Sequence, residues 1–135
     1  GKEKNIKYYH ELSKQLKVDS KVIFTGPRTD VDDFYTISDI FLFPTHYDPF
    51  SNVVLEAMNF ENVIFTTNKN GASEILDKKY IMKSPLDTEI ISSIDSLLNN
   101  RPLLESTKLN NRKKSKLFSI ENNLYKTLEV IDQIN

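Results

Sequence analysis

The sequence predicts an α/β fold in which helices flank a parallel sheet. Short apolar runs of about five residues alternate with segments of helical periodicity, and this alternation is typical of parallel sheets. The apolar runs are rich in β-branched and aromatic residues, which favour buried strands. Each of the three glycines falls between periodic segments, where the backbone must turn.

The predicted strands are the apolar runs, and two of them stop at a glycine or a proline. They are Lys21–Thr25, Asp39–Phe43, Val63–Thr67 and Tyr80–Met82. We expect about four strands to pair in parallel. Open parallel sheets bind ligands beyond the carboxyl ends of their strands, so the loops that follow these runs are the first places to look for a site.

The predicted helices carry apolar residues three and four positions apart. They are Lys4–Leu16, Asp30–Ile37, Val53–Phe60, Ala72–Leu76, Asp87–Leu98, Pro102–Lys116 and Ile120–Ile134. Asp87 and Ser119 are suited to cap their helices, and Pro102 suits a first turn.

Composition limits the function classes. The chain has 135 residues, 39% of them hydrophobic and 27% charged, which is ordinary for one globular domain. The net charge of −1 gives no general attraction to nucleic acid or to anionic membranes. The sequence contains no cysteine, which excludes disulfides and thiolate chemistry and agrees with a reducing cytosol. No apolar run reaches the ~18 residues needed to cross a bilayer.

The most informative segment runs from Asp39 to Met58. A buried strand enters a loop bounded by prolines, and a helix begins near Ser51. Free amides and the dipole at such a helix start attract phosphate or sugar oxygens. Asp48 stands just before the helix, and Glu56 lies inside it within an apolar stretch. A carboxylate there needs a partner, and ribose hydroxyls can donate two hydrogen bonds to it.

This segment resembles a known family. It is similar to the donor-site motif of the retaining GT-B glycosyltransferases of family GT4. That motif has an aspartate, an apolar strand and a proline, followed by an acidic residue with Pro-Phe and, further on, Glu-Ala-Met. In that motif seven residues separate two acidic residues, as they separate Asp48 from Glu56. Val22-Ile-Phe-Thr-Gly26 resembles the strand before the pocket for the donor base. Asn70-Gly-Ala-Ser-Glu74 resembles the family's Gly-x-x-Glu. Within this family, the residues from Tyr47 to Val53 are most similar to those of lipopolysaccharide-core glucosyltransferases.

The resemblance implies a fold and a set of roles. Residues 1–135 would be the Rossmann-like C-terminal domain of a GT-B enzyme, in part, with its C-terminal helices at about 87–135. Glu56 would hold the ribose, and Asp48, the catalytic residue, would face the transferred sugar. Gly71 and Glu74 would lie near the diphosphate or the sugar. Backbone amides that would contact sugar hydroxyls or the diphosphate belong to Phe50, Ser51, Asn52 and Val53. Residues that would line the base are Gly26, Pro27, Arg28 and Thr29.

The resemblance also implies a reaction. A hexose would pass from a nucleoside-diphosphate sugar, UDP-linked, to a glycan or lipid-linked glycan with retention, in cell-surface polysaccharide or lipopolysaccharide synthesis. The acceptor would approach on the face that the nucleotide leaves, and the departing diphosphate would act as base. Neither a metal nor a cofactor would be needed.

The resemblance further implies that the chain is one part of a longer enzyme. The acceptor domain, and the Arg and Lys that clamp the diphosphate, would lie upstream of Gly1. We therefore expect the chain alone to be soluble and inactive, with no nucleic-acid partner. The full-length enzyme would be cytoplasmic and would touch the inner face of the membrane only peripherally.

The sequence departs from the family pattern after Met58. The family follows this position with a small residue, a glycine and a proline, whereas Asn59-Phe-Glu-Asn-Val63 stands here. We expect Asn62 to adopt the left-handed conformation that a glycine would otherwise supply.

Each candidate carboxylate also has a plainer interpretation. Asp48 could be a turn residue before Pro49, and Glu74 an exposed residue on a short helix. Glu56 could be a structural carboxylate paired with an amide or a basic side chain.

Two further features favour plain interpretations. Asp30-Val-Asp32 matches an Asp-x-Asp metal motif, but an acidic helix start explains it better. His46 is expected to be a solvated loop residue. With two histidines and no cysteine in the sequence, we expect no metal site.

Other functions remain open on the same fold. One is a sugar-nucleotide epimerase or a phosphorylase, although no lysine has the context of a pyridoxal-phosphate site. Another is a binding module that has kept the pocket and lost the chemistry. Asp48, where the family usually has glutamate, is the one hint of that.

Overall fold

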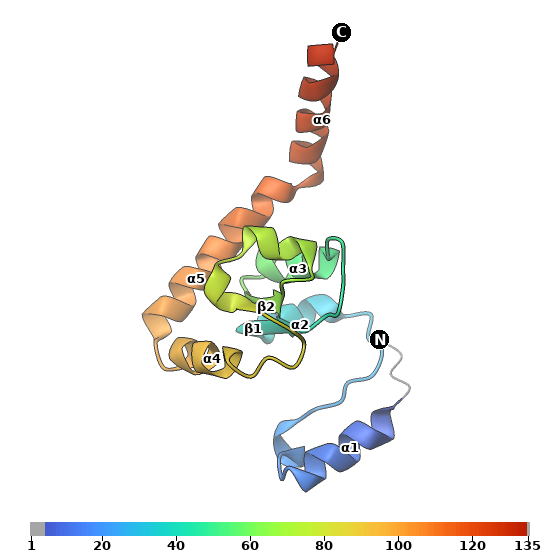
Figure 1. Cartoon of the computed structure of the whole chain (residues 1–135), viewed down its shortest axis with the longest axis vertical. Coiled ribbons are helices and arrows are strands. Elements are labelled where there is room, and N and C mark those ends of the chain that lie inside the picture. The colour runs from blue at the N-terminus through green and yellow to red at the C-terminus, as the bar shows by residue number, and fades with distance from the viewer. Residues whose placement is uncertain (1–4, 135) are drawn as a thin grey trace. The chain divides into compact units, whose positions relative to one another are not determined.

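The computed structural model describes residues 5–134. They divide into two compact units, of which the first ends at Val31 and the second begins at Asp32. Each unit is described by itself, and Figure 1 follows the chain through both.

The first unit contains helix α1 (Ile6–Gln15), a 3₁₀ turn η1 (Asp19–Lys21) and a segment without regular secondary structure after it. The ring of His10 on α1 packs on the ring of Phe24, with 4.2 Å between their centroids. The first predicted helix is confirmed over its described part; its expected first residue, Lys4, lies outside the described residues.

The predicted strand Lys21–Thr25 is wrong. Lys21 closes η1, Val22 is extended, and residues 22–25 pair with no strand among the described residues. The side chain of Ile23, expected to be buried, is 86% exposed. The composition of this run favours a strand, but a strand also needs a neighbour to complete its hydrogen bonds.

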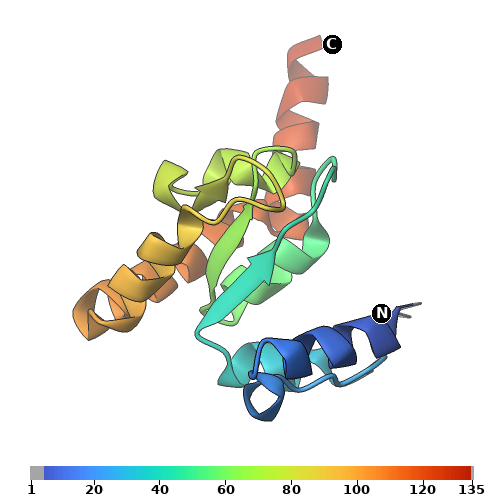
Figure 2. The same cartoon turned by 60° about the horizontal axis from the view of Figure 1, so that its bottom comes forward.

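The second unit is built on a sheet of three parallel strands in the order β1-β2-β3. They are β1 (Ile40–Phe43), β2 (Val63–Thr67) and β3 (Ile81–Met82). Ile40 of β1 pairs with Val63, and Thr67 of β2 pairs with Met82. Figure 2 shows the arrows of β1 and β2 side by side and pointing the same way. The predicted α/β class and three of the four strands are confirmed; the fourth was Lys21–Thr25.

Strand β2 is the centre of the core, because all five of its residues are buried. Ile64 faces helices α2 (Val31–Ile37) and α3 (Asn52–Asn59) and the 3₁₀ turn η2 (Gly71–Ile75). Its buried companions there are Tyr35, Val54, Ala57, Met58, Ala72 and Leu76. Val63 and Phe65 face the other way, and their buried companions are Tyr80, Met82, Ile90, Leu97 and Leu104. Burial on both faces explains the continuous apolar run.

Helix α3 ends in a Schellman cap. The Asn62 N–H donates to Ala57 O at 3.0 Å, and the Glu61 N–H donates to Met58 O at 3.1 Å. The left-handed residue is Glu61, with φ 63°, so the expectation for Asn62 was wrong by one position. Asn62 is fully buried, and its amide donates to Tyr35 O at 2.8 Å. The motif places the left-handed residue directly after the C-cap, which leaves Asn62 to join α3 to α2.

Helix α5 (Arg101–Ser115) packs along α3. Asn111 donates to Asn62 O at 2.9 Å. The Lys108 ammonium donates to Asp39 Oδ1 at 2.8 Å, and this hydrogen bond holds the pKa of Asp39 below its usual value.

Three of the remaining helices were predicted: α4 (Ile90–Leu98), α5 and α6 (Ile120–Ile134). The 3₁₀ turns η3 (Lys78–Tyr80) and η4 (Lys116–Phe118) were not, and η3 includes Tyr80, which was expected to begin a strand. Pro102 lies in the first turn of α5, and Ser119 Oγ accepts the Asn122 N–H, as expected of a cap. Asp87 does not cap α4, because its carboxylate accepts the N–H groups of Lys83 and Glu89 and closes the preceding loop instead. Among the described helices, none is long and apolar enough to span a membrane.

Two adjacent leucines of α4 test the assignment of the core. Leu97 is 1% exposed and Leu98 is 56% exposed. We expect Leu97→Ala to lower the free energy of unfolding by about 2–5 kcal/mol through lost burial and a cavity. Leu98→Ala should change it by less than about 0.5 kcal/mol. Urea unfolding of both variants is the measurement, and equal losses would contradict the packing described.

Candidate functional site

The loop after β1 is shaped by Asp48. Its Oδ1 accepts the N–H of Phe50 at 3.1 Å, which closes a tight turn around Pro49. Thr45 Oγ1 donates to Tyr47 O at 3.1 Å within the same loop. The plainer interpretation of Asp48 as a turn residue is therefore correct for one of its oxygens. The side chain is half-buried, and its second oxygen has no hydrogen bond from the described residues.

The loop after β1 is joined to the loop after β2. Asp48 forms a parallel bridge with Asn70: the Asp48 N–H donates to Lys69 O at 3.1 Å, and the Gly71 N–H donates to Asp48 O at 2.9 Å. A Cβ on Gly71 would lie 1.9 Å from Pro49 O. Gly71 is therefore required by the close approach of the two backbones, whatever else it contacts.

A buried hydrogen-bond network holds this junction. Asn70, 1% exposed, donates from Nδ2 to Ser51 Oγ at 3.0 Å and to Thr66 Oγ1 at 3.1 Å. Its Oδ1 accepts the Ala72 N–H at 3.0 Å. Thr66 Oγ1 in turn donates to Phe43 O at 2.8 Å. The ends of both strands, the start of α3 and the start of η2 thus meet at one amide.

Sequence reasoning missed Asn70 and Thr66 as members of the site. The available signal was a pair of hydroxyl residues at the end of a fully apolar strand, followed shortly by Asn-Gly. Buried polar side chains of this kind require hydrogen-bond partners. Here Asn70 and Thr66 are hydrogen-bond partners of each other.

The two loops form an open pocket of about 250 Å³. It brings together three predicted site residues, Asp48, Gly71 and Glu74, of which Glu74 is exposed. The other residues that line it are Tyr47, Pro49, Asn68, Lys69, Asn70 and Ser73.

The start of α3 leaves backbone donors open. Ser51 occupies the N-cap position, but its side chain makes no capping hydrogen bond. Among the described residues the N–H groups of Asn52 and Val53 have no acceptor. Phe50, just before the helix, packs its ring on Phe118 with 6.1 Å between centroids. The helix start can therefore receive an anion or sugar oxygens.

Glu56 lies on α3 but does not line this pocket. Its side chain is exposed rather than held in the apolar stretch. It lies beside the hydroxyl of Tyr35, which is 8% exposed. Burial raises the pKa of Tyr35, and the charge of Glu56 and its hydrogen bond add to the rise. Glu56 thus lies near the Tyr35 phenol of α2, with its side chain exposed.

The residues predicted to line the base lie in the first unit. Gly26 has φ +67°, as a residue in a turn often does. Arg28 forms a two-pronged ion pair with Asp30, and this hydrogen bond lowers the pKa of Asp30. The first unit is described by itself, so the place of Gly26, Pro27 and Arg28 in a donor site stays a prediction.

The plain interpretation of Asp30-Val-Asp32 agrees with these contacts. Asp30 is paired with Arg28, and Asp32 and Asp33 occupy the first turn of α2. Within the described part of the chain, no three His, Cys, Asp or Glu side chains are grouped to hold a metal ion. His46 is exposed in its loop.

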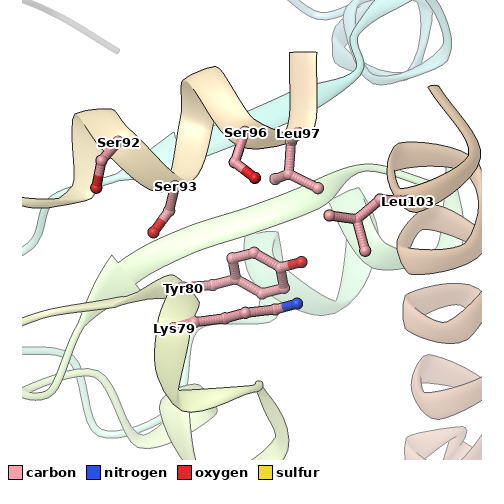
Figure 3. Close-up of a pocket in the computed structure, with 7 residues that line it drawn as sticks. All are labelled: Lys79, Tyr80, Ser92, Ser93, Ser96, Leu97 and Leu103. Atoms are coloured by element: carbon pink, nitrogen blue, oxygen red, sulfur yellow. The ribbon is translucent and has the colours of Figure 1, made fainter. Parts of the chain in front are cut away.

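A second pocket of about 150 Å³ lies between η3, α4 and the start of α5 (Figure 3). Two of its polar groups have partners: Ser92 donates to Glu89 O at 2.8 Å, and the Tyr80 hydroxyl lies 3.3 Å from Thr107 Oγ1. The ammonium of Lys79 lies 4.8 Å from the centre of the Tyr80 ring. The lining residues are Lys79, Tyr80, Ser92, Ser93, Ser96, Leu97 and Leu103. None is a predicted site residue.

The close approach at Gly71 can be tested against the other internal glycine. We expect Gly71→Ala to cost about 3 kcal/mol, because its Cβ would collide with a backbone oxygen that cannot move without opening the junction. At Gly26 a Cβ would meet nothing within 4 Å, so Gly26→Ala should cost only the left-handed strain of about 1–2 kcal/mol. Urea unfolding compares the two, and a smaller loss for Gly71→Ala would refute the assigned role.

Known structures share this fold. HepE of Anabaena in complex with UDP superposes with a TM-score of 0.81 at 19% identity, over 95% of this chain and 36% of that one. WaaG, described as a glycosyltransferase involved in lipopolysaccharide biosynthesis, gives 0.73 at 21% identity, over 82% and 31%. These likenesses confirm the predicted Rossmann-like, GT-B type of fold.

Sequence comparison identifies the family. The capsular polysaccharide biosynthesis glycosyltransferase CapM of Staphylococcus aureus is 33% identical over 102 residues, which are 73% of this chain and 27% of CapM. The chain thus spans less than a third of CapM and of WaaG. The family model for glycosyl transferases group 1 matches residues 1–114. With the junction, its pocket and the open helix start inside that match, the chain belongs to the glycosyl transferases group 1 family.

Proposed function

We propose that this chain is the donor-binding part of a retaining GT-B glycosyltransferase of family GT4. The enzyme moves a hexose from a UDP-linked sugar to a glycan or lipid-linked glycan in cell-surface polysaccharide or lipopolysaccharide synthesis. One observation carries the proposal. The junction between the loops after β1 and β2 sets two carboxylates, Asp48 and Glu74, in one pocket, and the open amides of α3 begin only a few residues along the chain from Asp48.

This arrangement suits a nucleoside-diphosphate sugar. Backbone N–H groups at a helix start favour a diphosphate, and carboxylates accept hydrogen bonds from sugar hydroxyls. HepE, which has this fold, has been solved with UDP and with UDP-glucose. CapM and WaaG carry names from capsule and lipopolysaccharide synthesis. These relatives support both the donor and the biological setting.

The three carboxylates divide the donor between them. Asp48 and Glu74 line the pocket and take the sugar. Glu56, exposed on α3 beside the Tyr35 hydroxyl, takes the ribose. Its two carboxylate oxygens can together accept several hydrogen bonds from the ribose hydroxyls.

The chemistry follows from positioning and charge. As the bond between the sugar and the phosphate breaks, negative charge grows on the diphosphate and positive charge on the sugar. The amides of Asn52 and Val53 stabilise the negative charge on the diphosphate, and the Asp48 carboxylate stabilises the positive charge on the sugar. The departing diphosphate takes the proton of an acceptor that arrives on the same face, which gives retention without a metal.

The rest of the enzyme supplies what this chain does not. The acceptor domain and the basic side chains that clamp the diphosphate belong to the remainder of a protein of the relatives' length. The chain alone binds donor without turning it over. The full-length enzyme works in the cytoplasm, peripherally at the inner face of the membrane.

Nucleotide binding by the chain itself tests the proposal directly. We expect saturation-transfer NMR to show UDP bound through its ribose protons, and UDP bound more tightly than GDP or ADP. Glu56→Gln should weaken the signal, whereas Glu129→Gln, an exposed glutamate of α6, should not. If none of the three nucleotides shows transfer, the donor site is not here.

Substitutions of the two acidic residues of the motif should have different effects in the full-length enzyme. Glu56→Gln keeps the shape but loses charge-assisted hydrogen bonds worth roughly 1.5–3 kcal/mol, so nucleotide affinity should fall about ten- to a hundredfold. Asp48→Asn should lower turnover and leave nucleotide affinity nearly unchanged, because its contact strengthens in the transition state. Dissociation constants and turnover numbers decide this. An equal loss of nucleotide affinity in both variants would overturn the assigned roles.

A further inference from the structure

Ser51 has the backbone of a helix cap without acting as one. It precedes α3 in an extended conformation, with φ −75° and ψ 112°, yet its hydroxyl makes no hydrogen bond to the helix. Serine in this position normally accepts the N–H of the second or third helical residue. Here the third, Val54, donates to the Ser51 carbonyl at 3.1 Å, so Val53 is the donor that the hydroxyl would reach.

Asn70 is the reason that the hydroxyl is occupied. Its Nδ2 donates to Ser51 Oγ at 3.0 Å, from a side chain that is 1% exposed. The amide cannot turn around, because its Oδ1 accepts the Ala72 N–H at 3.0 Å and Nδ2 also meets Thr66 Oγ1 at 3.1 Å. The Ser51 hydroxyl is therefore held on the side of the loop after β2.

The consequence lies at the helix start. Because the hydroxyl is withheld, Val53 N–H has no acceptor among the described residues, and Asn52 N–H has none either. An unpaired backbone donor is costly where water is excluded, but it is valuable where a ligand supplies the acceptor. An internal cap would compete with that ligand for the same hydrogen atom.

We propose that Asn70 is a positioning residue that keeps α3 open to its ligand by preventing Ser51 from capping the helix. The proposal rests on the proposed function, in which the diphosphate of the donor is that ligand. Without the Asn70 amide the Ser51 hydroxyl turns to the Val53 N–H and competes with the phosphate oxygens. Asn70 acts through Ser51 and need not touch the donor.

Four proteins test this: wild type, Asn70→Ser, Ser51→Ala and the double variant. Serine at position 70 can still accept the Ala72 N–H in a local turn but is too short to reach Ser51. We expect Asn70→Ser to weaken UDP binding by about two- to thirtyfold, the equilibrium factor of a helix cap. Ser51→Ala keeps the backbone amide but has no hydroxyl, so it is the reference against which the double variant is compared. The double variant should recover the affinity lost by Asn70→Ser, because no hydroxyl is left to cap α3.

Titration calorimetry with UDP gives the affinities, and recovery is the decisive result. A merely structural Asn70 would leave the double variant as weak as Asn70→Ser or weaker, and that result would overturn the proposal. The matched control is Thr107→Ser, which should bind UDP as wild type does. Thr107 is a buried threonine of α5 that lies outside the pocket and hydrogen-bonds with Leu103 O and the Tyr80 hydroxyl.

Hydrogen exchange of the Val53 amide tests the same idea without ligand. Asn70→Ser should slow its exchange relative to wild type by a similar factor, and Ser51→Ala should leave it unchanged. If wild type binds no UDP and these exchange rates hold, the proposed function fails and the withheld cap stands. If Asn70→Ser does not fold, Ser51→Ala alone decides: faster exchange at Val53 would mean that Ser51 already caps α3, which would refute the proposal.

Discussion

The site depends on one buried amide. Asn70 lies where strand β2 ends, and its side chain reaches the start of α3, the first residues of η2 and, through Thr66, the end of β1. Without it, the Ala72 N–H would lose its acceptor, and the hydroxyls of Ser51 and Thr66 would each lose a donor. The absence of a side chain at Gly71 then lets the two loops touch through their backbones. The positions of the two loops at the pocket are therefore set by their contacts with the ends of the strands.

The apolar core determines where that amide can be. Ile64 packs toward α3 and Phe65 toward α4, so β2 is clamped from both sides and its carboxyl end is fixed. Hydroxyl residues Thr66 and Thr67 begin where the apolar residues stop, and both donate to carbonyls of β1 or the loop after it. The strand thus changes from hydrophobic packing to hydrogen bonding within one residue, at the edge of the sheet where ligands of parallel sheets bind.

The sequence predicted elements that follow from a local residue pattern or from an unbroken apolar run. Val63–Thr67 was predicted to the residue because burial on both faces leaves an unbroken apolar run. Lys21–Thr25 has the same appearance but pairs with nothing described, and pairing is not visible in composition. The left-handed residue that ends α3 is Glu61 rather than Asn62, because the capping motif requires that conformation directly after the C-cap residue Phe60. Asn62 instead donates a hydrogen bond to Tyr35 O of α2. Asp48 and Glu74 could be placed in one site by motif; the Asn70 network required the two loops to be seen together.

The spacing of the motif separates two kinds of carboxylate. Asp48 precedes α3, and one of its oxygens is fixed by the Phe50 N–H, so its remaining oxygen points in a direction set by the backbone. Glu56 lies in the second turn of the helix on a longer, exposed side chain near the Tyr35 phenol. A rigid acceptor favours a reacting group whose position must be exact to a fraction of an ångström. An adaptable one suits a ribose whose hydroxyls only have to be held. Under the proposed function, the seven residues between them therefore place one carboxylate at the transferred sugar and the other at the ribose.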